Sequence, residues 1–379
     1  MNIAKVDKVT QASVTGAEML VDAVAAHGVD TIFGLPGLQL DYIFDALYHR
    51  QDAIRVIHTR HEQATAYMAF GYAQATGRVG TCLVVPGPGV LNATAALSTA
   101  YACNAPVLCI TGQIPSAHMG GGLGFLHEIP DQARALASVT KWQGLIENGA
   151  EIPRKVHEAF RQLNGGRRRP VVLEIPPDIA AARFAAPPAL PPSALPDPPA
   201  PDPEAISRAA KLLNEARNPA IFVGSGVFGA ETELRELAEM MQAPVIMSEH
   251  GMGALDIRHP LAQTLQVGND LWPAVDVALA VGFHGWGNEM CKAANTIGND
   301  LDRIAKQDAQ IASVTLTYAT EADHENLQWK TPEMHSYYGS SLPIMPDKCQ
   351  LLTNPIDLVA VFAAGYLQGK ASIIANAIE

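Results

Sequence analysis

The sequence lacks a basic surface. Charged residues make up only 17% of its 379 residues, and the formal net charge is −12. The only cluster of positive charge is Arg167, Arg168 and Arg169. Binding to a nucleic-acid backbone needs many positive charges on one face, so we expect no nucleic-acid partner.

Long apolar runs are also missing. The nearest candidate, "IDLVAVFAAGYL", ends before Gln368 and Lys370 and is well short of the roughly 20 residues that span a bilayer. The opening stretch, "MNIAKVDKVTQ", has no apolar core of the kind found in signal peptides. We therefore expect a cytoplasmic protein with no membrane partner.

Cysteines are few, and their spacing forms no motif. Their number is odd and no C-x-x-C pair occurs, which is typical of buried thiols in a reducing compartment. His58, His61 and Glu62 are residue types that bind metals, but the H-E-x-x-H zinc pattern is absent. We expect no metal site built by this chain. The cysteines are Cys82, Cys103, Cys109, Cys291 and Cys349.

What the sequence does contain is an alternation of short apolar strands with helices. In the first half the strands are expected at "TIF", "IRVI", "TCLVV", "PVLCIT" and "PVVLEI". Thr15 and Glu18 form a capping box that starts the first helix, and Gly28 ends it. This alternation indicates a parallel sheet covered by helices on both faces.

A proline-rich segment divides the chain. More than half of residues 187–203 are proline, which excludes a helix or a central strand and favours a stiff linker. A second alternation of strands and helices follows and ends near Gly282. Beyond it the period is lost, with only a helix suggested at "LDRIAKQDAQI" and a strand at "ASVTLTYA".

The predicted fold class is therefore α/β, with two doubly wound, mainly parallel-sheet domains. We place the first domain at residues 1–185, the linker at 186–202 and a smaller Rossmann-like domain at 203–282. Residues 283–379 stay unassigned.

Four loops follow the predicted strands: "GLPG", "HEQA", "GPG" and "LHEIPDQ". Ligands bind at the carboxyl edge of open α/β sheets, so the four loops together predict a binding site. Glu62 lies in one of them, at the start of a helix of small apolar residues. An acid there has two interpretations: a favourable charge near the helix macrodipole, or a group that acts on a ligand.

At these loops the sequence resembles a known family. "AHGVDTIFGLPG", "RHEQATAYMAFGYAQATG" and "VVPGPGVLNATAALSTAYACNAPVLCITGQ" are similar to the thiamine-diphosphate-dependent enzymes of the acetolactate synthase group. The resemblance covers residues 12–282. It implies a pyrimidine-binding domain at residues 1–185, a central domain at 203–282, a 2-oxo acid substrate and a homodimer or homotetramer.

The resemblance also implies roles for individual residues. Glu62 would contact the aminopyrimidine ring nitrogen of the cofactor and relay a proton that activates the thiazolium carbon. Pro36, Gly37, Pro88 and Asn92 would line the pyrimidine pocket, although Asn92 also suits the first turn of a helix.

His127 departs from the family pattern. It takes the place of a glutamine that many relatives have, and it is either a proton-transfer group or a structural residue. Because of this departure, a related carboligase or a decarboxylase of 2-oxo acids stays open beside the acetolactate reaction.

A glycine-rich loop in the second domain leaves a further question open. Gly224, Gly226 and Gly229 match G-x-G-x-x-G between a strand and a helix, the pattern of a nucleotide loop. Some relatives bind FAD in this domain and others bind nothing there. Glu249 is a weak candidate for the acid that such a site needs. This loop is the only feature that supports a third hypothesis, that the protein is a nicotinamide dehydrogenase.

The metal-binding signature of the family is absent. Relatives hold the diphosphate through Mg²⁺ at a G-D-G motif followed by an asparagine, and this sequence contains no Gly-Asp dipeptide. We therefore expect a truncated enzyme, or one whose partner chain supplies the diphosphate-binding domain and the Mg²⁺. The alternative is a non-catalytic relative that acts in oligomerisation or in FAD or ADP binding.

Overall fold

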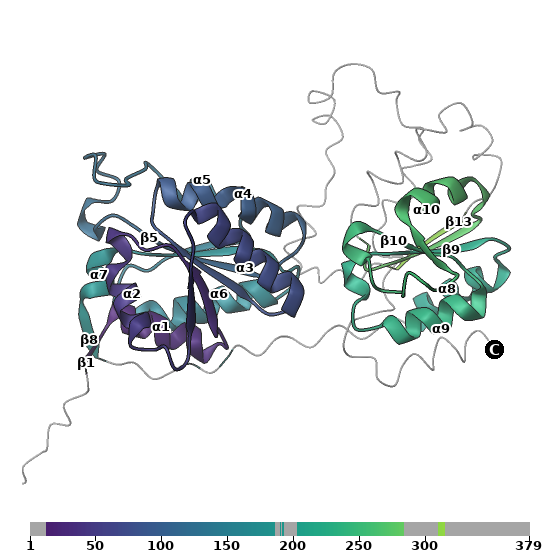
Figure 1. Cartoon of the computed structure of the whole chain (residues 1–379), viewed down its shortest axis with the longest axis horizontal. Coiled ribbons are helices and arrows are strands. Elements are labelled where there is room, and N and C mark those ends of the chain that lie inside the picture. Colours follow the sequence, from purple (N-terminus) through teal and green to yellow (C-terminus); the bar gives the residue numbers. More distant parts are fainter. Residues whose placement is uncertain (1–12, 186–189, 191, 193–202, 284–309, 315–379) are drawn as a thin grey trace, which may run out of the picture. The chain divides into compact units, whose positions relative to one another are not determined.

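The computed structural model describes residues 13–185, 190, 192, 203–283 and 310–314 (Figure 1). The chain divides into two compact units, Met1–Pro196 and Asp197–Glu379. This division falls within the proline-rich segment, and each unit is described by itself. Among the described residues, no helix is both long and apolar enough to cross a membrane.

The first unit is built on a six-stranded sheet in which every neighbouring pair of strands is parallel. The strand order is β3-β2-β4-β5-β7-β6, so β3 lies at one edge, β6 lies at the other, and the last strand, β7, is placed between β5 and β6. The strands are β2 (Thr31–Gly34), β3 (Arg55–His58), β4 (Gly80–Val84), β5 (Val107–Gly112), β6 (Trp142–Leu145) and β7 (Val171–Ile175).

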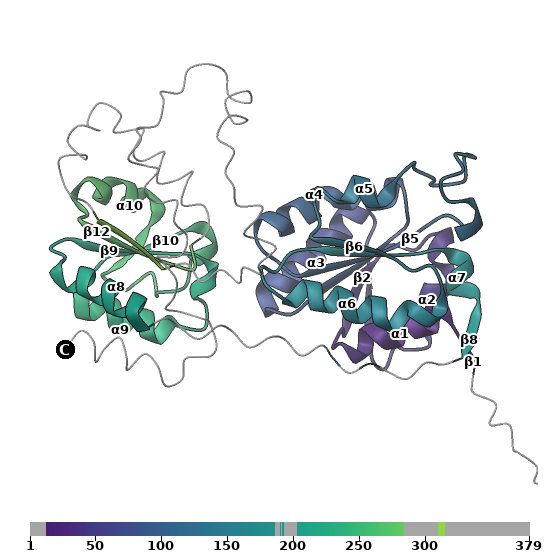
Figure 2. The ribbon, with the colours of Figure 1, turned by 180° about the vertical axis from the view of Figure 1, so that it is seen from behind.

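Helices cover both faces of this sheet (Figure 2). Alternate strand residues point to opposite faces, as Ile32 and Phe33 do: each belongs to a different buried cluster. On one face lie α1 (Gly16–Ala26), α2 (Asp41–Tyr48) and α6 (Ile152–Asn164); on the other lie α3 (Glu62–Thr76), α4 (Pro88–Ala102) and α5 (Gln132–Leu136).

Local signals in the sequence explain where the first helix begins. Both hydrogen bonds of the predicted capping box are present, since the Thr15 hydroxyl accepts from the Glu18 amide at 3.1 Å and Glu18 accepts from the Thr15 amide at 2.6 Å. After the helix, Gly28 has a φ of +87°, a conformation that favours glycine. Shorter elements complete the unit: β1 (Ser13–Thr15), which pairs antiparallel with β8 (Arg183–Ala185), η1 (Leu38–Leu40), η2 (Ser116–His118), η3 (Gly149–Glu151) and α7 (Pro177–Ala181).

The second unit is a smaller parallel sheet in the order β11-β10-β9-β12-β13. Helices α8 and α9 pack on one face and α10 on the other, which confirms the predicted α/β class with two doubly wound domains. Its elements are α8 (Pro203–Glu215), β9 (Pro219–Val223), η4 (Ser225–Val227), α9 (Glu231–Met241), β10 (Val245–Met247), η5 (Glu249–Gly251), β11 (Ala262–Thr264), α10 (Leu265–Leu271), η6 (Trp272–Ala274), β12 (Val277–Val281) and β13 (Gln310–Val314).

Strand β13 belongs to the stretch that the sequence left unassigned. It pairs in parallel with β12, from Gln310 beside Val277 to Val314 beside Val281. The strand expected at residues 312–319 overlaps it only in part, and most of the helix expected at 301–311 lies outside the described residues. The sheet of the second unit therefore draws a strand from beyond residue 282.

Helix α3 approaches the sheet very closely. Ala66, Ala69 and Ala73 on its inner face are buried, and a β-carbon on Gly80 of β4 would overlap the carbonyl of Ala69. Small residues on the helix and glycine in the strand thus set the distance between α3 and β4.

We expect Gly80→Ala to lower the free energy of unfolding of the first unit by about 2 kcal/mol or more, because α3 must move away from the sheet. Gly71→Ala is the matched control, since a β-carbon there meets nothing within 4 Å and alanine favours a helix by roughly 0.5–1 kcal/mol. Denaturant unfolding in dilute solution measures both. Equal effects of the two variants would contradict the close contact of α3 with β4.

Candidate functional site

The loops after β2 and β4 meet at the carboxyl edge of the first sheet, as expected from the sequence. Val85, directly after β4, lies between them. A β-carbon on Gly37 would overlap the Cγ1 methyl of Val85, and a β-carbon on Gly89 would overlap its Cγ2 methyl. Both glycines are needed for this approach, which brings residues 34–37 (the GLPG loop) against residues 87–89 (the GPG loop).

Glu62 is the first residue of α3 and is half-buried. Its Oε2 accepts a hydrogen bond of 3.0 Å from Nδ2 of Asn92, which lies on α4. A β-carbon on Gly89 would lie 3.4 Å from the other oxygen, Oε1. The carboxylate is therefore placed beside the amino-terminal turns of two helices, and Asn92 contacts it directly.

The residue before Glu62 caps the helix. Nδ1 of His61 accepts from the amide of Gln63 at 3.1 Å, so His61 supplies the N-cap and Glu62 is left for another contact. Pro36 of the GLPG loop and Pro88 of the GPG loop are exposed. Pro88 also begins α4, a position in which the missing N–H of proline costs nothing. Within the described part of the chain Oε1 of Glu62 has no hydrogen-bond partner, so this oxygen is open to a ligand.

The loop that carries His127 lies against the GPG loop. A β-carbon on Gly87, whose φ is +59°, would overlap the carbonyl of His127. His127 itself has a φ of +68°, and its Nδ1 lies 3.2 Å from Oε1 of Gln39. Gln39 also donates to the carbonyl of Leu126 at 2.9 Å. The buried Gln39 side chain thus holds the His127 loop at the same sheet edge as Glu62.

Glu128, the residue after His127, binds backbone amides of the same loop. Its carboxylate accepts from the amides of Gly122 and Phe125 at 3.0 and 2.9 Å. Hydrogen bonds from backbone N–H groups, that of Phe125 above all, hold the pKa of the Glu128 carboxyl below its usual value. An ionised Glu128 therefore fixes the turn that ends at His127.

Sequence analysis did not identify a second carboxyl of this unit, which is buried. Glu174 on β7 is only 2% exposed, and its Oε2 accepts from the side-chain amides of Gln132 and Gln113 at 2.9 and 3.0 Å. Burial raises the pKa of Glu174 although both amides oppose the shift. The one signal available was a single acid in the apolar run "PVVLEI".

A small cavity of about 160 Å³ adjoins Glu174. Gln113, Asp131 and Gln132 supply its polar wall, and Ile114, Ile129 and Leu145 are among its apolar residues.

The glycine-rich loop of the second unit has a reason in packing. β-Carbons on Gly224 and Gly226 would overlap the backbone of Gly282, and the amide of Gly226 donates to the Gly282 carbonyl at 3.1 Å. Gly229 has a φ of +95°. The close approach of two chain segments and a turn therefore explain the three glycines without a nucleotide. Glu249, the weak candidate for a partner acid, is exposed in η5.

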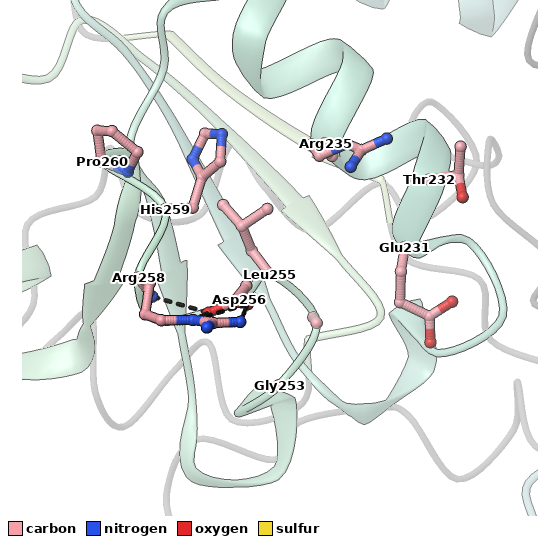
Figure 3. A pocket seen from close by; sticks show the side chains of 10 residues that line it. Glu231, Thr232, Arg235, Gly253, Leu255, Asp256, Arg258, His259 and Pro260 are labelled. Carbon is pink, nitrogen blue, oxygen red and sulfur yellow. Dashed lines mark hydrogen bonds and ion pairs between the residues drawn. The ribbon is translucent and has the colours of Figure 1, made fainter.

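A cavity of about 680 Å³ lies elsewhere in this unit. Figure 3 shows Arg258 paired with Asp256 at its wall, and Nε2 of His259 lies 3.1 Å from Glu239. None of the three loop glycines lines it. No group of three or more histidine, cysteine and acidic side chains that could hold a metal ion occurs among the described residues.

Comparison with known families decides what kind of protein carries this site. The profile of the "thiamine pyrophosphate enzyme, N-terminal TPP binding domain" matches residues 14–135, and that of the "thiamine pyrophosphate enzyme, central domain" matches residues 206–324. The chain belongs to the thiamine pyrophosphate enzyme family. The second match runs past residue 282 and includes β13.

Individual relatives agree with this assignment. An acetolactate synthase of Arthrospira platensis is 36% identical over 312 residues, which are 76% of this chain and 53% of that protein. A probable 2-ketoarginine decarboxylase of Pseudomonas aeruginosa is 35% identical over 298 residues, 78% of this chain and 53% of that protein. A probable acetolactate synthase large subunit of Methanocaldococcus jannaschii is 30% identical over 375 residues, 96% of this chain and 59% of that protein.

These matches confirm the resemblance to the acetolactate synthase-like group that the motifs predicted. The chain spans only about half the length of the curated relatives it matches.

We expect Glu174→Gln to change how the stability of this thiamine pyrophosphate family member depends on pH. The folded chain keeps a proton on Glu174 at pH values where the unfolded chain, with a pKa of about 4.3, has lost it. Wild-type stability therefore falls as the pH rises from there through the raised pKa. The variant lacks this loss, so its stability relative to wild type rises over the same window.

Glu18→Gln is the matched control for this measurement, because the pKa of Glu18 is lowered, chiefly by the Thr15 amide. Glu18 therefore stabilises the folded chain above its unfolded pKa, and that stability is lost as the pH falls. Denaturant unfolding at a series of pH values should give opposite trends for the two variants. The same trend in both would show that Glu174 does not titrate as its burial implies.

Proposed function

We propose that the first unit supplies the aminopyrimidine side of a thiamine diphosphate site in a carboligase or decarboxylase of 2-oxo acids. The observation that supports this most directly is the Glu62 carboxylate, held by Asn92 through one oxygen and open at the other. A carboxyl with one free oxygen at a ligand-binding sheet edge suits a proton relay better than a charge placed only to stabilise α3.

The residues around Glu62 fit an aminopyrimidine. Oε1 can share a proton with a ring nitrogen, while Asn92 prevents the carboxylate from rotating away. Gly37 and Gly89 draw the two loops together beside it. The bound cofactor would supply the nucleophilic carbon that attacks the 2-oxo acid. The task of Glu62 is to hold and return the proton at the pyrimidine end.

His127 is the second group that we propose to act in this site, on the substrate side. Its ring is held by Gln39, and an imidazole can give or take a proton near pH 7. The relatives named above include both an acetolactate synthase and a probable 2-ketoarginine decarboxylase. The proposal therefore names the class, 2-oxo acids, and leaves the side chain of the substrate open.

A second copy of the chain is the partner that this site needs. The exposed side of α3 and α4 carries Tyr67, Met68 and Leu91. Between residues 62 and 76 the only charged residue is Glu62, and residues 88–102 contain none. A charge-free apolar face of two adjacent helices suits a subunit interface. Covering it would also exclude water from Glu62.

The diphosphate and its Mg²⁺ would be held by residues outside the described part of this chain. The sequence contains no Gly-Asp dipeptide, and the described residues offer no cluster of metal ligands. We propose that the diphosphate-binding half is supplied by a further domain or a partner chain.

Binding of thiamine to the chain tests the role of Glu62. Because only the pyrimidine end is held, we expect thiamine and thiamine diphosphate to bind within about threefold of one another, with no effect of Mg²⁺ and no consumption of pyruvate. Glu62→Gln should weaken both by roughly 10- to 100-fold, the loss of one hydrogen bond of about 1.5–3 kcal/mol to a charged group. Titration calorimetry measures these affinities.

Glu18→Gln is the control for Glu62→Gln, since it also removes an acid from the first turn of a helix. It should destabilise α1 and leave thiamine binding unchanged. Tight Mg²⁺-dependent binding of thiamine diphosphate, or pyruvate consumption by the chain alone, would contradict the divided site. Unchanged affinity in Glu62→Gln would remove Glu62 from it.

Self-association should depend on the α3–α4 face. We expect Met68→Lys to convert an oligomer to monomer at tens of micromolar protein, because the change buries an unpaired charge in the interface. Met240→Lys is the matched control, an exposed methionine on α9 of the second unit. Sedimentation equilibrium gives the masses. Wild type that is monomeric at this concentration, or equal behaviour of both variants, would refute this interface.

A further inference from the structure

One side chain ties together the carboxyl ends of three adjacent strands. Oε1 of Gln132 accepts from the amide of Gly87, which follows β4, at 2.8 Å. Its Nε2 donates to the carbonyl of Gly112 on β5 at 3.1 Å and to Oε2 of Glu174 on β7 at 2.9 Å. Strands β4, β5 and β7 are neighbours in the sheet, and Gln132 is only 2% exposed.

The contact with Gly87 is special because of the residues on each side. Pro86 and Pro88 have no N–H, so Gly87 offers the only backbone donor in residues 86–88. The side chain of Gln132 takes that donor. Helix α4 begins at the next residue, Pro88, and carries Asn92 one turn further on. The bond from Gln132 to Gly87 therefore fixes the start of the helix that holds Glu62.

Glu174, together with the backbone groups of Gly87 and Gly112, determines which way the amide of Gln132 faces. The Gln132 Nε2 group lies beside two acceptors, Oε2 of Glu174 and the Gly112 carbonyl. A reversed amide would point its oxygen at both acceptors and its N–H group at the Gly87 N–H. Oε1 of Glu174 has no hydrogen-bond partner, so a proton placed there leaves Oε2 free to accept. The orientation of Gln132 is thus the same whether Glu174 is neutral or ionised.

We propose that Gln132, oriented by Glu174, is a positioning residue that holds the GPG loop so that Asn92 meets Glu62. The role in cofactor binding rests on the function proposed above, whereas the anchoring of the loop does not. A residue that served only to fill the core would not need a polar bond to the Gly87 N–H.

Hydrogen exchange in the full chain tests the anchoring without any cofactor. In Gln132→Met, which keeps the length of the side chain, we expect the Gly87 amide to exchange about tenfold faster, the effect of losing one buried hydrogen bond. The side-chain amide of Asn92 should also exchange faster, because its contact with Glu62 loosens. NMR of the labelled chain resolves both groups.

Gln113→Met is the matched control. Gln113 donates to the same Oε2 of Glu174, but its own amide oxygen accepts from the Ile114 amide and not from Gly87. Both variants should lose thermal stability, whereas Gly87 should stay within about twofold of wild type in the control. Unchanged exchange of Gly87 in Gln132→Met, or equal acceleration in both variants, would overturn the proposal.

If Gln132→Met does not fold, a double variant in which the two side chains are exchanged tests the proposal instead. In Gln132→Glu combined with Glu174→Gln, one oxygen of the acid at 132 can accept from Gly87. The other oxygen, when it carries the proton, can donate to the Gly112 carbonyl and accept from the new amide at 174, whose oxygen can still accept from Gln113. We expect Gly87 protection to return to within about threefold of wild type. Protection that stays lost in a folded double variant would count against a polar role for this pair.

Thiamine titration separates this inference from the proposed function. If Gln132→Met weakens thiamine binding and Gln113→Met does not, both stand. If Gly87 responds as expected while thiamine binds not even the wild type, the anchoring stands and the cofactor site fails. If thiamine binds wild type and Gln132→Met equally, Gln132 does not position Glu62.

Discussion

The side chain of Val85 fills the space that two missing β-carbons would take, and the geometry of the site depends on this contact. Gly37 approaches it from the GLPG loop and Gly89 from the GPG loop. Because the loops can come no closer and a side chain would push them apart, the valine sets their separation. Glu62 lies next to Gly89 of the GPG loop. The distance from Glu62 to the GLPG loop therefore depends on how closely the two loops pack against Val85.

Two carboxyls at this sheet edge differ in what surrounds them. Glu174 is buried and bonded to two amides, and its contacts hold backbone in place. Glu62 is half-buried, bonded to one amide, and keeps an oxygen open. In both carboxyls only one oxygen is hydrogen-bonded, but the second oxygen of Glu174 is buried. A fully buried carboxyl suits a structural anchor, whereas a half-buried one suits work on a ligand. The different environments therefore make Glu174 a structural anchor and Glu62 a candidate for proton relay.

The sequence predicts those parts of this protein that have a period or a fixed local motif. The apolar runs placed the central strands, the Thr15–Glu18 box placed the start of α1, and the loops placed Glu62 at the carboxyl edge of the sheet. Contacts between distant residues leave no such trace: Gln132 meets Gly87 across 45 positions. Strands such as β1 and β8 are too short to show a period. The glycines of "GSGVFG" suggested a nucleotide because backbone packing and phosphate binding require the same residue.

The half-buried state of Glu62 links the proposed chemistry to assembly. A carboxyl that shares a proton with a ring nitrogen works best where water is excluded, and within the first unit Glu62 is only half-buried. It begins α3, and Met68 of this helix and Leu91 of the neighbouring α4 are exposed. A second copy that buries this face would also shield the carboxyl. On this proposal the proton relay is completed by association, and an isolated chain holds its parts in position without the dry environment that lets them act.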